Sequence, residues 1–166
     1  MLFLHFLAFS CKPDWEIKFP KGVQPIDWEN YNDVYTVYWN FLKNCSEPWS
    51  NELGKDIKVC GWIFQSSDGG FSPVNTIYYF CLINKEENIF ADYPDDGTGV
   101  VISVVIGRSD EDKAFIDSLK NKFATSDITK KCYIKGKLSF ETSSDLRSCY
   151  KYPQIVISNA DDIYFE

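Results

Sequence analysis

The residues of this chain that could do acid–base chemistry are few and form no recognisable catalytic set. The only histidine is His5, in an apolar run at the N-terminus. Without an imidazole elsewhere, the chain has no Ser–His or Cys–His pair to activate a nucleophile at neutral pH. Glu86 or Glu87 could face Asp92, yet no two carboxylates are set at the separation that glycoside hydrolysis needs. We therefore expect a protein that is not an enzyme, with a carboxylate-dependent hydrolase as one alternative.

Metal ligands are also sparse. Asp92, Asp95 and Asp96 lie together in DYPDDGTG, and calcium prefers such oxygen-rich turns. The segment does not follow EF-hand spacing, because Pro94 takes a ligand position and Ser103 stands where a glutamate is needed. The cysteines show no CxxC spacing, which argues against zinc. The three aspartates are thus a weak calcium candidate, and we expect no metal and no cofactor.

Tyrosine, lysine and arginine side chains form the strongest constellation. Lys131, Tyr133, Lys135 and Lys137 share one face of a predicted strand, and further aromatic and basic residues lie in two loops. Proteins that bind single strands stack bases on such rings and hold phosphates with such cations. Exposed tyrosine and arginine also suit protein interfaces, and lysines can simply solubilise a strand. The candidate ligand-binding residues are Phe71, Tyr133, Lys135, Lys137, Arg147, Tyr150, Lys151 and Tyr152.

The net charge bears on the kind of ligand. The 166 residues carry a formal charge of −7, and phosphate contacts need surplus lysine and arginine. Nucleic acid is therefore a disfavoured partner on this reasoning. We expect a non-catalytic binding or adaptor module whose ligand is a protein, a peptide or a glycan, including a possible immunity or inhibitor role. The alternative is a domain that binds single-stranded nucleic acid.

The elements that position these residues are mainly β-strands. Aromatic and β-branched residues dominate the apolar runs, which predict five strands at 57–65, 76–84, 100–107, 131–140 and 153–158, with the last one resuming at 162–166. Residues 108–123 predict a helix, because Ser109 can cap it and Phe115, Ile116, Leu119 and Phe123 form an apolar stripe. Three strands, a helix and two strands are the order of a five-stranded OB-fold Greek-key barrel.

Two glycines support this fold. Gly61 and Gly136 interrupt otherwise strong strands, the first and the fourth of the barrel, which are neighbours in this topology. Glycine weakens a strand interior, but a small barrel needs sharp bends. We expect the two glycines to allow a shared bend, with Ile57, Val59 and Ile63 pointing into the barrel.

The N-terminal part is expected to lie outside the barrel. Trp28, Tyr31, Tyr35, Tyr38 and Leu42 recur at helical spacing, which predicts a helix within 27–45, capped by Asp27 or Asn32. The composition of VYTVYW favours a strand as the alternative. It should pack against the outside of the barrel or across one end. The expected organisation is a signal segment at 1–11, a tether at 12–26, a helical extension at 27–54 and the OB-fold domain at 55–166.

The first residues resemble the end of a bacterial lipoprotein signal peptide. Residues 2–9 are apolar and AFSC resembles a loose lipobox ending at Cys11, although no basic residue precedes the apolar run. The resemblance implies a lipid on Cys11 and a place in the cell envelope, at the periplasmic face or on the surface of the outer membrane. If Cys11 is lipidated, Cys45 and Cys149 are the better disulfide candidates in an oxidising compartment. The other interpretation is a buried N-terminal strand.

Three segments, KVCGWI, CYIKGKLSF and YPQIVISNADDIYFE, resemble small OB-fold lipoproteins of bacterial cell envelopes, as in the Bacteroidota, akin to the OB families labelled tRNA-anti-like. The resemblance covers roughly 55–166. It implies the fold and the envelope location. It brings no catalytic motif, so no functional residue follows from it.

Overall fold

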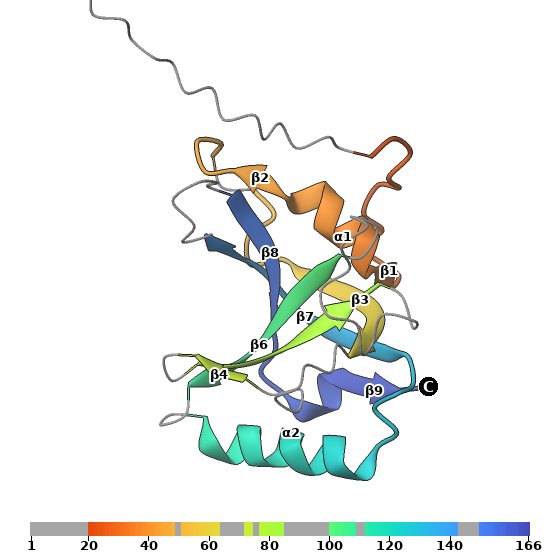
Figure 1. The fold of residues 1–166 in the computed structure, drawn as a ribbon, viewed down its shortest axis with the longest axis vertical. Helices are drawn as coiled ribbons and strands as arrows, with labels where there is room; N and C mark the ends of the chain where they lie inside the picture. Colours follow the sequence, from red (N-terminus) through yellow and green to blue (C-terminus); the bar gives the residue numbers. More distant parts are fainter. Residues whose placement is uncertain are drawn as a thin grey trace, which may run out of the picture.

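Five strands close into a barrel in the computed structural model, which describes residues 20–48, 51–63, 72–74, 77–84, 100–108, 112–142 and 150–166 (Figure 1). Their order around the barrel is β3 (Asp56–Ile63), β5 (Ile77–Ile83), β6 (Val101–Arg108), β8 (Tyr150–Val156) and β7 (Cys132–Thr142). β7 pairs back with β3, which closes the barrel. Only β6 and β8 run parallel among these neighbours. The predicted OB-fold barrel is confirmed.

Two helices lie at opposite ends of the barrel (Figure 1). The helix between the third and fourth barrel strands is α2 (Lys113–Thr125), which begins later than predicted, with Asp112 rather than Ser109 at the N-cap position. It buries Ile116, Leu119 and Phe123 of the predicted stripe and leaves Phe115 half-buried. Phe123 packs edge-on against Phe80 of β5, with ring centroids 5.2 Å apart. The N-terminal helix is α1 (Val34–Phe41), and its buried residues join the same core.

The remaining elements are short. β1 (Asn32–Asp33) runs parallel to β3, and β2 (Lys43–Asn44) pairs with β8. β4 (Ser72–Val74) pairs with β5 in a segment that the sequence predicts as loop. A 3-10 turn, η2 (Ala160–Asp162), leads into β9 (Ile163–Phe165). β9 pairs with β7, so it forms an extra strand rather than a continuation of the last barrel strand.

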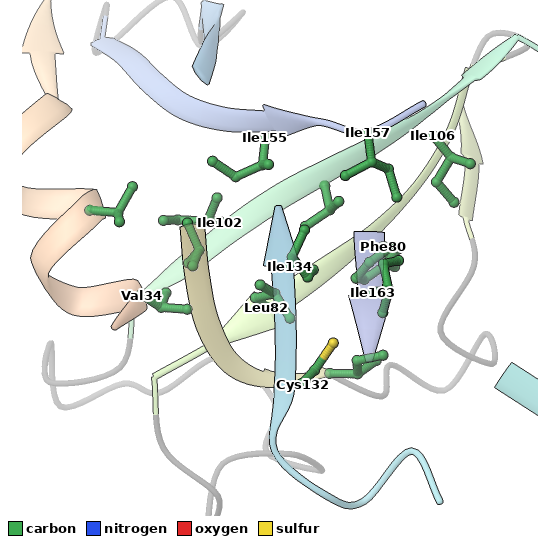
Figure 2. Close-up of a cluster of buried hydrophobic side chains, with 14 of the residues drawn as sticks. Val34, Phe80, Leu82, Ile102, Ile106, Cys132, Ile134, Ile155, Ile157 and Ile163 are labelled. Atoms are coloured by element: carbon green, nitrogen blue, oxygen red, sulfur yellow. The ribbon is translucent and has the colours of Figure 1, made fainter. Parts of the chain in front are cut away.

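The core consists of the inward side chains of the barrel strands together with residues of α1, α2 and β9, and Figure 2 shows part of it. Alternation along β3 buries Ile57, Val59 and Ile63, as the sequence predicts. Alternation along β6 buries Ile102, Val104 and Ile106 and leaves the residues between them half-buried. Burial of aliphatic side chains on this scale is the main favourable term in folding.

Gly61 and Gly136 do not share one bend. Gly61 lies opposite Cys132, and Gly136 lies opposite Ile57, so the glycines are several positions apart in the β3–β7 ladder. Each stands where its strand changes neighbour: β3 pairs with β5 from Trp62 onward, and β7 pairs with β8 from Lys137 onward. Each glycine therefore allows a separate close approach to a neighbouring strand: Gly61 to β5 and Gly136 to β8.

The N-terminal helix is shorter than predicted and buries another face. It begins after Asp33, so neither Asp27 nor Asn32 caps it, and it ends at Phe41. The fully buried side chains are Val34 and Val37, whereas Tyr35 and Tyr38 are only half-buried. Aliphatic side chains fill the end of the narrow barrel, and the larger tyrosine rings pack around its edge.

A substitution at the N-cap of α1 tests how much the cap contributes to the stability of the protein. Asp33 accepts hydrogen bonds from the Thr36 amide at 2.7 Å and from the Thr36 hydroxyl at 3.2 Å. We expect Asp33→Ala to lower the free energy of unfolding by about 1 kcal/mol, because the amide then loses its partner. Urea denaturation measures this. Asp33→Ser should retain most of the stability, and equal stability of Asp33→Ala and the wild type would show that the cap contributes nothing.

Several N-terminal predictions lie outside the described residues, including the signal segment, the anchor Cys11 and most of the tether. Cys45 is disulfide-bonded, and its partner is not among the described residues. Cys60, Cys81 and Cys132 are free thiols, and burial raises the pKa of Cys132 to about 12. Within the described ranges, no helix has the length and apolar character needed to cross a membrane.

Candidate ligand-binding face

A stacked tyrosine pair lies on the outer side of β7. The β7–β9 register places Tyr164 directly opposite Tyr133. Their rings lie face to face, with centroids 4.7 Å apart and planes 2° from parallel. Tyr164 keeps 46% of its surface exposed, so the pair is accessible from outside. Two parallel rings on a strand surface form a platform on which a further flat group can stack.

Tyr31 completes this group from the segment before β1. Its ring meets Tyr133 edge-on at 5.2 Å and Tyr164 edge-on at 6.1 Å. Partial burial is the main cause that raises the pKa of Tyr31 to about 12. The Tyr133 hydroxyl donates a hydrogen bond to Glu166 at 3.0 Å, and this bond is the largest cause of the raised pKa of Tyr133. The raised pKa keeps Tyr31 and Tyr133 neutral at physiological pH, and the ring contacts fix the orientation of the group.

Lysines lie beside the rings. The Lys131 ammonium is 5.4 Å from the ring centroid of Trp62 and 5.7 Å from that of Tyr133. Lys135 is exposed and lies opposite Lys58 in the β3–β7 ladder. Cations next to aromatic rings are the combination that single-strand binders use. We call this surface the aromatic–lysine face, made up of Tyr31, Trp62, Lys131, Tyr133, Lys135 and Tyr164.

Carboxylates limit the positive charge of this surface. Lys137 continues the lysine stripe but pairs with Asp56 at 2.9 Å. Glu166 lies at the edge of the aromatic–lysine face, on the Tyr133 hydroxyl. Both partners of the Lys137–Asp56 pair are mostly exposed, and such pairs contribute little to stability. The face is therefore locally basic at its centre, along Lys131 and Lys135, and mixed at its margins.

In an OB-fold the ligand usually binds on the outer surface of two particular strands, and the described side chains on that surface offer little binding chemistry here. That surface belongs to the second and third barrel strands, β5 and β6. Four of its outward positions have described side chains, Cys81, Val101, Ser103 and Val105, and these four are half-buried and carry neither charge nor an aromatic ring. Tyr79, two positions before Cys81 in β5, is described in its backbone only. Among the side chains that the structure describes, rings and lysines lie next to one another on the β3–β7–β9 side.

The structure divides the predicted ligand-binding residues between several places. Tyr133, Lys135 and Lys137 lie on the outer side of β7, as predicted. Tyr150 and Tyr152 lie at the start of β8, beside the C-terminal half of α1. The candidates Phe71 and Arg147, the aspartates Asp92, Asp95 and Asp96, and the hydrolase carboxylates Glu86 and Glu87 are outside the described residues.

The Lys151 side chain is buried and holds two parts of the backbone together. It retains 7% of its surface, and its ammonium donates a hydrogen bond to the Glu47 carbonyl oxygen. This contact, together with the β2–β8 pairing, fixes the segment after α1 on the barrel. Burial takes the Lys151 ammonium out of reach of a ligand on the barrel surface.

A second aromatic group surrounds Tyr152. Tyr38 lies 6.3 Å from Tyr152 and 5.1 Å from Trp39, and Tyr35 and Tyr150 extend the group. All five rings are half-buried. We call this the rim cluster: Tyr35, Tyr38, Trp39, Tyr150 and Tyr152.

Among the residues that the structure describes, no group of three or more histidine, cysteine, aspartate or glutamate side chains could hold a metal.

Solved structures of similar fold include those of single-stranded DNA-binding proteins. The mitochondrial protein Rim1 of S. cerevisiae is 12% identical, with a TM-score of 0.41 over 68% of this chain and 94% of its own. A small protein of Streptomyces coelicolor is 15% identical (TM-score 0.39, 68% and 94% covered). The Plasmodium falciparum SSB, in complex with ssDNA, is 15% identical (TM-score 0.40, 70% and 97% covered). No family model and no curated protein matches the sequence.

Two predictions from the sequence are corrected by these similarities. The acidic net charge predicts that nucleic acid is a disfavoured partner, yet the similar folds belong to proteins that bind single-stranded DNA. Net charge is a sum over the whole chain and does not fix the charge of one face. The expected lipid-anchored envelope location also has no counterpart among these proteins, which are described as single-stranded DNA-binding, one of them as mitochondrial.

Proposed function

We propose that this chain is an OB-fold module that binds single-stranded nucleic acid on the aromatic–lysine face. The stacked pair of Tyr133 and Tyr164 carries the proposal, because it presents an exposed, rigid platform on the outside of the barrel. A base that stacks on an aromatic side chain contributes about 1–3 kcal/mol of binding free energy. The similarity to known DNA-binding proteins is one of fold, so the proposal depends on the side chains of this chain.

The lysines supply the second part of the interaction. Lys131 lies beside the stacked pair, and Lys135 lies two positions after Tyr133 on the same side of β7. A phosphate next to a stacked base would lie within reach of one of these cations. Every base has a flat face, so recognition by stacking tolerates different sequences. We therefore expect binding of single strands with little preference for sequence.

Charge reversal tests the proposal. Lys131→Glu and Lys135→Glu should each weaken binding of a labelled oligothymidylate, because a cation at a phosphate becomes an anion. Each should also reduce the slope of log K against log salt by about 0.7 in magnitude, the value for one phosphate contact on a single strand. Fluorescence anisotropy titrations at several salt concentrations measure both quantities.

A matched control is Lys113→Glu. Lys113 is exposed at the start of α2 and pairs with Asp117 on the same helix, so its reversal changes the net charge equally but lies away from the face. It should leave the affinity almost unchanged. Absence of any binding by the wild type at low salt would contradict the proposal. An equal loss of affinity in Lys113→Glu and Lys131→Glu would also contradict it.

A further inference from the structure

We propose that the bound strand follows the outer side of β7 from the aromatic–lysine face to the rim cluster. The site would then hold a run of several nucleotides, with its two ends making different kinds of contact. This inference rests on the proposed function and deepens it by giving the extent and direction of the site.

The outer side of β7 connects the two aromatic groups. Successive outward positions are occupied by Tyr133, Lys135, Lys137, Ser139 and Glu141, while the residues between them point inward. At about 3.3 Å per residue, the eight steps from Tyr133 to Glu141 span about 26 Å. A stacked strand rises about 3.4 Å per nucleotide, so this length corresponds to at most about eight nucleotides. That number is within the range of about 4–16 nucleotides per OB-fold.

The middle of this path can hold phosphates. Lys135 is exposed, and Lys137 shares the Asp56 carboxylate in a pair whose side chains are 63% and 88% exposed. A pair so open to water contributes little free energy, so Lys137 can exchange Asp56 for a phosphate at small cost.

The far end of the path is aromatic rather than basic. The β7–β8 register places Tyr152 opposite Glu141, and the Glu141 carboxylate accepts a hydrogen bond from the Gln154 amide at 2.7 Å. A carboxylate at this point disfavours phosphate contacts, whereas Tyr152 and its neighbour Tyr38 offer rings for stacking. The rim cluster should therefore add affinity without adding to the salt dependence.

A length series tests the inference with Tyr152→Ala and its control Tyr152→Phe, which keeps the ring. With an oligothymidylate of about eight nucleotides, Tyr152→Ala should weaken binding about fivefold or more, the effect of losing one stacked base. It should leave the salt slope unchanged, and it should leave binding of a trinucleotide unchanged. Tyr152→Phe should behave as the wild type. Circular dichroism and urea denaturation verify that both variants are folded.

The inference is overturned if Tyr152→Ala binds the longer strand normally, or if it weakens both lengths equally. In either case wild-type binding of the trinucleotide leaves the proposed function intact, whereas failure of the wild type to bind any length removes both. Photocrosslinking of the wild type gives a second test. A 5-iodouridine at one terminus should crosslink to residues 131–135 or 163–165, and at the other terminus to residues 150–154. Absence of any crosslink to 150–154 would contradict the path.

Discussion

Gly61→Ala is expected to lower the free energy of unfolding by about 3 kcal/mol. A Cβ at this position would lie 2.6 Å from the Val34 side chain of α1 and 2.7 Å from the carbonyl oxygen of Ile83. The Val34 methyl could shift, but the Ile83 carbonyl belongs to the backbone of β5 and cannot move without disturbing its pairing with β3. Overpacking in a tightly packed core costs about 1–3 kcal/mol, and a clash with backbone lies at the upper end.

Gly136 should behave in the same way for the same reason. A Cβ there would lie 2.6 Å from the Ile155 side chain and 2.6 Å from the carbonyl oxygen of Val156. The control is Gly54→Ala, because nothing lies within 4 Å of that position and only its φ of +82° opposes a side chain. Its cost should be about 1–2 kcal/mol. Urea denaturation compares the three variants, and a Gly61→Ala protein as stable as the wild type would show that the barrel does not need this close approach.

The second large effect concerns binding. The double variant Tyr133→Ala/Tyr164→Ala should weaken binding of a single-stranded oligonucleotide by about 10- to 100-fold, because it removes the stacking platform. The salt slope should stay close to that of the wild type, since no cation is lost. Anisotropy titrations of the kind described for the lysine variants measure both effects.

The control for this variant is Tyr133→Phe. It keeps the ring and loses only the hydrogen bond to Glu166. Its affinity should therefore be close to that of the wild type, and its stability should change by about 1 kcal/mol at most. If the double alanine variant binds as tightly as the wild type while remaining folded, the stacked pair is not a binding platform.

Much of the fold could be predicted because its signals are local. Alternating apolar residues marked the barrel strands, and the stripe of Ile116, Leu119 and Phe123 marked α2. The face of α1 could not be predicted in this way. Its tyrosines recur at helical spacing as regularly as its valines, and only the narrow end of the barrel decides that Val34 and Val37 are buried.

The site was only partly predictable, because it depends on pairing between distant strands. Tyr133 and Lys135 could be assigned to one outward face from the period of β7 alone. Tyr31, Trp62 and Tyr164 were missed, since they come from three other parts of the chain that the β1–β3, β3–β7 and β7–β9 pairings bring together. The tyrosine in the final strand, two residues before Glu166, was the available signal, but its value depended on knowing that β9 pairs with β7.

Titration of the isotopically labelled wild type with an oligothymidylate at low salt, mapped through its amide chemical shifts, tests the location of binding most directly. We predict that the largest shifts fall at residues 131–135 and 163–165, and that they diminish as salt is added. No shifts at low salt, or shifts confined to β5 and β6, would contradict a nucleic-acid interface on the aromatic–lysine face.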